Sequence, residues 1–179
     1  MKTSRFLTLT AGFLLAPLVL LAEGDNATAP KLTDANIAAI VVAANDIDIH
    51  AGKLAEKQAE NADAKGLGEM MVRDHTAVNQ QAKDLVTKLN VTPEPNDLSR
   101  KLRAVAKKTY AELKSKHGAE FDRAYVANEV AYHQSVISVV QTMLIPAAHN
   151  AELKTLLEQV VPALQAHLEH AKHVQAELK

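Results

Sequence analysis

Apolar residues recur along this chain at steps of three and four, which is the spacing of one face of an α-helix. Four long stretches follow the pattern, at about residues 36–61, from the next turn to about 90, at 120–144, and from 151 to the C-terminus. They are separated by the segments "ENADAKG", "NVTPEPND" and "IPAAHN", which carry turn residues or prolines. No stretch alternates as a strand would. The pattern predicts an all-α protein, an antiparallel four-helix bundle.

A shorter amphipathic helix is expected between the second and third long helices, at about residues 97–117, with Asp97 as its N-cap. Its 100–116 segment is strongly basic and has Glu112 as its single acid. Two interpretations stay open, a solvated polar face or weak contact with an anionic envelope surface. In the last long stretch, Pro162 predicts either a kink or a separate first helix.

The first 22 residues have the layout of a secretory signal peptide. Lys2 and Arg5 precede the apolar run Phe6–Leu21, after which the chain turns polar. That run of 16 residues contains a proline and is short for a membrane span. We therefore expect export, with cleavage near Ala22.

These features divide the chain into a signal peptide (1–22), a polar lead (23–35) and a helical bundle domain (36–179). The chain has no cysteine, which excludes disulfides and the lipid-modified cysteine of a lipoprotein. No second apolar run is long enough to cross a bilayer. We therefore expect a periplasmic or secreted mature protein without a transmembrane span.

Charge and motifs narrow the classes of partner. Without Lys2 and Arg5, the 20 basic residues fall to 18 against 21 acidic residues, a formal charge of about −3. This balance gives no case for nucleic acid as a partner. The sequence contains no nucleotide or haem motif and no nucleophile–base pair, so we expect a binding or structural protein rather than an enzyme. The oligomeric state is not fixed by these features.

Each long helix nevertheless points an ionisable residue at the core. Continuing the apolar periodicity places four such residues on the inward stripes: Asp48, His75, His133 and His167. Glu129 lies on a neighbouring stripe of the third long helix. Counted from the turns, these positions lie at similar heights in an antiparallel bundle. Single buried charges are costly, so the residues should be paired with one another or bound to something.

Three interpretations follow from this layer. It is either a hydrogen-bonded polar layer that fixes helix register, or a site for a divalent or transition metal ion with ligands Asp48, His75, Glu129, His133 and His167. A di-iron oxidase is disfavoured because such sites use Glu-x-x-His pairs, and none occurs in this chain. His173 should face water, whereas the helix rotations decide whether His50 and His170 join the layer.

The segments "GKLAEKQAENADAKGLGEMMVRDH", "FDRAYVANEVAYH" and "VPALQAHLEHA" resemble a family of exported bacterial proteins of ferritin-like fold, catalogued as domain of unknown function 4142. The family pattern maps onto this chain as follows: Asp48, Asp74, His75, His133 and His167. The chain departs from it at "DIDIH", where Asp48 stands in place of the commoner Glu and His50 is added. The resemblance implies a helical envelope protein with a metal-binding role, and implies no reaction.

Overall fold

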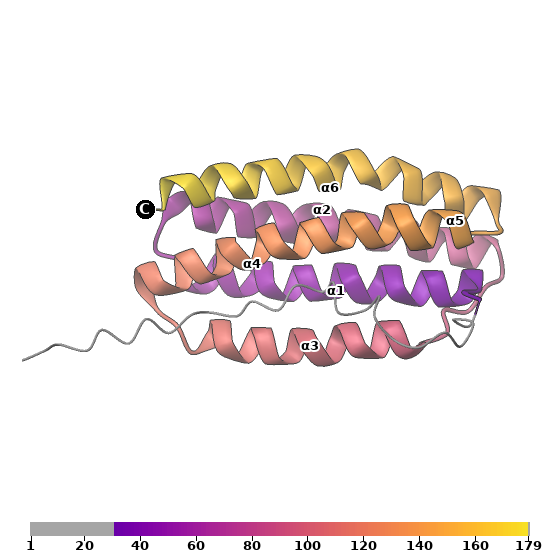
Figure 1. Cartoon of the computed structure of the whole chain (residues 1–179), viewed down its shortest axis with the longest axis horizontal. Coiled ribbons are helices and arrows are strands. Elements are labelled where there is room, and N and C mark those ends of the chain that lie inside the picture. Colours follow the sequence, from indigo (N-terminus) through magenta and orange to yellow (C-terminus); the bar gives the residue numbers. More distant parts are fainter. Residues whose placement is uncertain (1–30, 179) are drawn as a thin grey trace, which may run out of the picture.

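The structure is a computed structural model that describes residues 31–178, so the expected signal peptide at 1–22 lies outside the described residues. The described chain is entirely helical. Figure 1 shows four long, nearly parallel rods with a fifth helix along one side, and their bounds are α1 Asp34–Gln58, α2 Ala62–Lys88, α3 Asp97–Lys114, α4 Gly118–Val139 and α6 Ala151–Glu177. The predicted four-helix bundle with an extra helix between its second and third members is therefore confirmed.

Asparagine and threonine side chains set the helix starts. Thr33 caps α1 in a reciprocal capping box with Asn36. Asn61 caps α2 by accepting two backbone N–H groups, and this is why α1 ends at Gln58 instead of reaching residue 61 as the apolar pattern indicated. Asn150 caps α6 in the same way.

Two buried or partly buried carboxylates tie loops to helices at the opposite ends of the bundle. Asp122 on α4 accepts the backbone N–H groups of residues 60–61 at 3.1 and 2.9 Å. Asp34 on α1 accepts those of residues 149–150 at 2.9 and 3.0 Å. Because each carboxylate satisfies two N–H groups in a tight connection, the two turns are fixed against the helices that they join.

The apolar core is divided into two clusters. One surrounds Phe121, Tyr125 and Met71, and the other surrounds Ile37 and Leu157. In each of the four long helices one buried ionisable residue lies in sequence between members of the two clusters: Asp48, His75, His133 and His167. The bundle therefore holds a polar layer with apolar packing on both sides.

Two glycines allow α1 and α2 to approach closely. A Cβ added at Gly52 would lie 2.7 Å from the carbonyl oxygen of Gly68, and one added at Gly68 would lie 2.9 Å from that of Gly52. Both distances are shorter than real side chains permit. The backbone contact at these positions sets the separation of the two helices just beside the polar layer.

Two details of the helices differ from the apolar pattern. The third long helix changes to a π-helix at Val140–Leu144, ahead of the short helix α5, Ile145–Ala147. Pro146 lacks the N–H that an α-helix would use at this point. The other detail concerns Pro162, which lies inside an unbroken α6 and is exposed to solvent, so the alternative of a separate first helix is wrong.

Candidate metal centre

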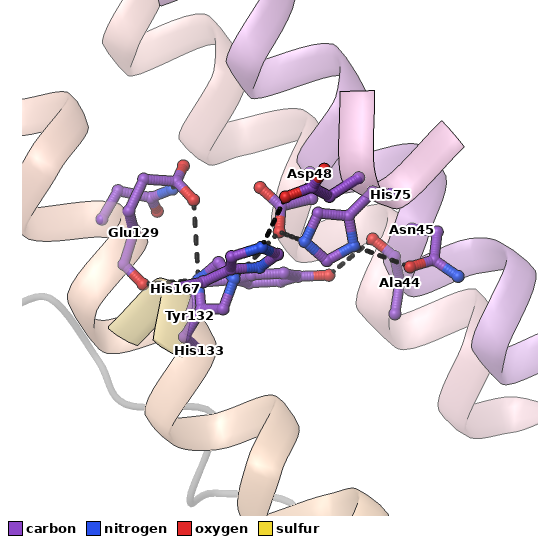
Figure 2. A network of polar contacts seen from close by, with 10 residues as sticks. Ala44, Asn45, Asp48, His75, Glu129, Tyr132, His133 and His167 are labelled. Carbon is purple, nitrogen blue, oxygen red and sulfur yellow. Dashed lines mark hydrogen bonds and ion pairs between the residues drawn. The ribbon is translucent and has the colours of Figure 1, made fainter. Parts of the chain in front are cut away.

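Three histidines from three helices meet in the middle of the bundle. Their ring centroids form a nearly equilateral triangle, with His75 and His167 5.3 Å apart, His133 and His167 5.5 Å apart, and His75 and His133 5.7 Å apart. All three side chains are buried. Figure 2 shows the side chains of His75, His133 and His167 close together beside Asp48.

Each imidazole uses one nitrogen to bind the surrounding protein. His75 Nδ1 donates to Asn45 Oδ1 at 2.7 Å, and His133 Nδ1 donates to the carbonyl oxygen of Glu129 at 3.0 Å. His167 Nε2 donates to Asp74 Oδ2 at 3.0 Å. Such outer hydrogen bonds fix the tautomer and the orientation of a ring, and they are typical of histidines that bind metal ions.

The other nitrogen of each ring is directed into the layer. His75 Nε2, His133 Nε2 and His167 Nδ1 are buried and have no hydrogen-bond partner within residues 31–178. Both carboxylate oxygens of Asp48 and Oε2 of Glu129 share this condition in the described chain. Buried polar atoms without partners are rare in folded proteins, and six of them face one another here.

Electrostatic attraction partly compensates for the missing hydrogen bonds. Asp48 Oδ2 lies 2.9 Å from His75 Nε2 and 3.5 Å from His133 Nε2. Glu129 Oε2 lies 3.7 Å from His133 Nδ1, and Asn128 donates to its other oxygen. The Asp48 pairs are close but lack hydrogen-bond geometry among the described residues, so the attraction is that of charges in a dry site.

The two carboxyl groups have opposite protonation behaviour. Burial by itself would raise the pKa of Asp48, but the charges of His75 and His133 outweigh burial and hold that pKa below its usual value. Burial, reinforced by the charge of Asp48, holds the pKa of Glu129 well above its usual value. Asp48 is therefore the ionised member of the pair, and Glu129 is the proton-holding one.

The pKa values of the three histidines are shifted in different directions. Burial lowers the pKa of His133 and of His167. Burial acts in the same direction on His75, but the neighbouring Asp48 carboxylate outweighs it and raises the pKa of His75 above its usual value. His133 and His167 are therefore the neutral imidazoles of the layer, whereas His75 is the one whose protonated form Asp48 stabilises.

The donor atoms suit a small cation. One ligand atom each from His75, His133 and His167 lies within 4.8 Å of the others, and the same holds for Asp48, Glu129 and His133. Nitrogen ligands of a tetrahedral ion are about 3.3 Å apart for bonds of about 2.0 Å. Small side-chain rotations close the remaining distance, so these residues fit a metal ion.

A cavity of about 110 Å³ adjoins the histidines and extends towards Leu144 and Leu157. His75, His167 and Asp74 line its polar end, and the rest of its wall is mainly aliphatic. The volume far exceeds the space that one water molecule needs. A small ligand can therefore reach the histidine edges from inside the bundle.

All five residues that the sequence indicated as ligands are buried in this one layer: Asp48, His75, Glu129, His133 and His167. His50 and His170 are exposed, so the structure leaves both outside it, and His173 faces solvent as expected.

Two partners of the histidines were missed from the periodicity. Asn45, which binds His75, lies three residues before Asp48, so its place one turn along the same face was the available signal. Asp74 was placed beside the inward stripe of His75 and in the family pattern, but its contact with His167, which joins α2 to α6, was not anticipated. The Tyr125 hydroxyl is buried without a partner in the described part of the chain, whereas the Tyr132 hydroxyl donates to the Ala44 carbonyl at 2.8 Å.

Comparison with solved structures shows the same fold in two DUF305 proteins. One is from Streptomyces coelicolor and has been inferred to be secreted; it has a TM-score of 0.69 and 9% sequence identity, over 81% of this chain and 93% of that chain. The other is a fragment from Deinococcus radiodurans, with a TM-score of 0.69 and 12% identity over 83% of this chain and 99% of that chain. The likeness is one of fold, the ferritin-like helical bundle that the sequence predicted.

Sequence comparison identifies the family directly. No curated protein gives a significant match. No helix within residues 31–178 has both the length and the apolar character of a membrane span. The family model described as "domain of unknown function (DUF4142)" matches residues 21–174. The chain therefore belongs to this family, as the motifs around its inward histidines indicated.

Proposed function

We propose that this protein is an exported metal-binding protein whose bundle holds a divalent or transition metal ion. Its nitrogen ligands are His75, His133 and His167, and its carboxylate ligands come from Asp48 and Glu129. The observation that carries the proposal is that the two nitrogens of each imidazole have different environments. One nitrogen is fixed by an outer acceptor, while the other is buried, inward and without a partner in residues 31–178.

The donor set restricts the metal. Imidazole nitrogen combined with carboxylate oxygen suits Zn²⁺, Cu²⁺, Fe²⁺ or Ni²⁺ better than Mg²⁺ or Ca²⁺, which prefer all-oxygen sites. A bound cation would also neutralise Asp48 and an ionised Glu129, whose charges otherwise oppose each other in a dry site.

Export rests on two features of different kinds. The first 22 residues have a basic start, an apolar run and a polar continuation, the order found in secretory signals. The S. coelicolor protein of similar fold has been inferred to be secreted. An oxidising compartment also suits a chain whose metal ligands include no cysteine.

A second candidate is a polar layer that fixes helix register without a metal. The ion pair of Asp48 with His75 favours it, because this pair already compensates part of the buried charge. The two candidates differ in what happens when the histidines are removed, since only the first predicts loss of a bound ion.

The deciding measurement is the metal content of mature, tag-free protein by mass spectrometry. The test variant replaces three buried histidines (His75→Ala/His133→Ala/His167→Ala). The matched control replaces three exposed ones (His50→Ala/His170→Ala/His173→Ala). Stoichiometric metal in the wild type and the control, with none in a helical test variant, is the expected result.

Other outcomes separate the alternatives. Metal lost equally from the control would assign it to the surface. A wild-type protein that contains no metal and has no affinity for Zn²⁺ or Cu²⁺ would support the second candidate, a polar layer without a metal. If the triple variant does not fold, His167→Gln removes a single ligand, and its metal content can be compared with that of the wild type. Dioxygen consumption by the Fe²⁺-loaded protein would instead point to a redox enzyme.

A further inference from the structure

Helix α3 does not close completely onto the bundle. It runs along α1 at the edge of the molecule (Figure 1), and a groove of about 480 Å³ lies between it and the facing sides of α1 and α4. This volume is within the usual range of small-molecule sites, about 300–1,000 Å³. The groove is separate from the histidine layer, since Tyr132 stands between them and lines both the groove and the core cavity.

The groove is mainly apolar, and α3 supplies much of its wall. Leu102, Val105, Ala106 and Leu113 follow one another along the helix at steps of three, one and seven, facing Ile47 of α1. From Leu102 to Leu113 the helix rises about 16 Å, so the groove is elongated. Val105 and Tyr110 are 42% and 38% exposed, and the described residues hold only one other large apolar side chain so exposed.

Cationic side chains flank this apolar surface. Arg103, Lys107 and Lys108 line the groove, against the single acid Glu112. Arg103 is engaged with Asp46 at 3.0 Å. Lys107 and Lys108 have no acidic partner within residues 31–178, so their charge is available to a ligand.

We infer that this groove binds a single-chain fatty acid the size of laurate, with its alkyl chain along the apolar wall of α3 and its carboxylate at the lysines. An elongated apolar channel with unpaired cations beside it is complementary in shape and charge to a single-chain anionic amphiphile. A helix that binds a flat membrane surface directs its apolar stripe outward. Leu102 and Leu113 are instead buried towards the bundle, which favours one chain lying in the groove between α3 and the bundle.

The first experiment titrates metal-free mature protein with sodium laurate below its micellar concentration, by calorimetry and by amide chemical shifts. One laurate per chain should bind, with shifts confined to α3 and the facing turns of α1 and α4. Sodium decanoate should bind about 15-fold more weakly, because each buried methylene contributes about four-fold. Dodecyltrimethylammonium, which has the same chain and a positive charge, should bind much more weakly than laurate.

Variants test each part of the groove. Lys107→Gln/Lys108→Gln should weaken laurate binding about ten-fold, whereas Lys65→Gln/Lys83→Gln, two exposed lysines of α2, should not change it. Ala106→Trp should block the groove. Val105→Glu serves if that variant unfolds, because Val105 is 42% exposed and a polar replacement there leaves the core intact.

Three results would overturn the inference. The first is equal binding of laurate and dodecyltrimethylammonium, and the second is shifts centred on the histidine layer. The third is flotation of the protein with phosphatidylglycerol vesicles without binding of free laurate, which would make α3 a membrane-surface helix. The three buried-histidine replacements should leave laurate binding unchanged in a folded protein, so this inference and the proposed metal site fail or succeed separately.

Discussion

His75 Nδ1 lies 2.7 Å from Asn45 Oδ1, across the interface of α1 and α2. The contact fixes the proton on Nδ1 and directs Nε2 into the layer, where it lies 2.9 Å from Asp48 Oδ2. We expect Asn45→Ala to weaken Zn²⁺ binding about 10- to 100-fold, the usual effect of losing such an outer partner. Competition with a chromogenic chelator measures it. Asn79→Ala is the control, since Asn79 is a buried asparagine one turn further along α2 that binds Asp46 instead; equal losses in both variants would contradict this role of Asn45.

Replacement of Asp48 should destabilise the metal-free protein. Asp48→Asn keeps the shape of the side chain but removes the charge that pairs with His75. Breaking a buried ion pair from one side costs about 3 kcal/mol, a fall in melting temperature of roughly 6–12 °C for a chain of this length. Thermal unfolding followed by circular dichroism gives the value. Asp46→Asn, on the same helix but one-third exposed, should cost no more than about 1 kcal/mol.

Glu129 gives the metal-free protein a characteristic pH dependence. Burial and the nearby Asp48 charge raise its pKa in the folded state above the usual value of 4.5. Between 4.5 and the raised pKa the folded chain therefore binds more protons than the unfolded chain, so this group makes stability fall as pH rises through that window. Glu129→Gln cannot ionise and should gain stability relative to the wild type on going from pH 4.5 towards pH 8. Melting curves in a chelator would refute this if the two proteins kept a constant difference.

Metal removal should lower stability reversibly. An ion that binds only the folded chain stabilises it by about 2.7 kcal/mol at a free concentration 100 times its dissociation constant. We therefore expect the melting temperature to rise with added Zn²⁺, to fall with EDTA, and to recover on reloading. The triple variant of the buried histidines should show no such response if it folds, whereas a response of wild-type size in that variant would place the ion elsewhere.

The glycine contact between α1 and α2 can be tested within one helix. Gly68→Ala places a methyl group 2.8 Å from the Ala55 side chain and 2.9 Å from the Gly52 carbonyl oxygen. The helices must then separate, at a typical cost of about 1–3 kcal/mol. Gly66→Ala, with open space around its Cβ, should stabilise the protein by up to about 1 kcal/mol through helix propensity alone. Denaturant unfolding of the two variants should shift in opposite directions.

The sequence by itself determined the architecture and the inward side of each helix. The apolar spacing of 3.6 residues per turn is a local property, so it placed His75, His133 and His167 on buried faces without knowledge of the neighbouring helices. Antiparallel connections of short length then set them at similar heights. Glu129 was also found, from its stripe beside that of His133.

Tertiary structure alone decided which atoms meet. A hydrogen bond between Asn45 and His75, or between Asp74 and His167, depends on the rotation and separation of two helices, which periodicity leaves undetermined by tens of degrees. The same rotations moved His50 to the surface. The opposite pKa shifts of Asp48 and Glu129 follow from distances between three helices, α1, α2 and α4. The groove beneath α3 follows from incomplete closure of that helix on α1 and α4. Local pattern fixes the face that a residue occupies, and packing between helices fixes its partner.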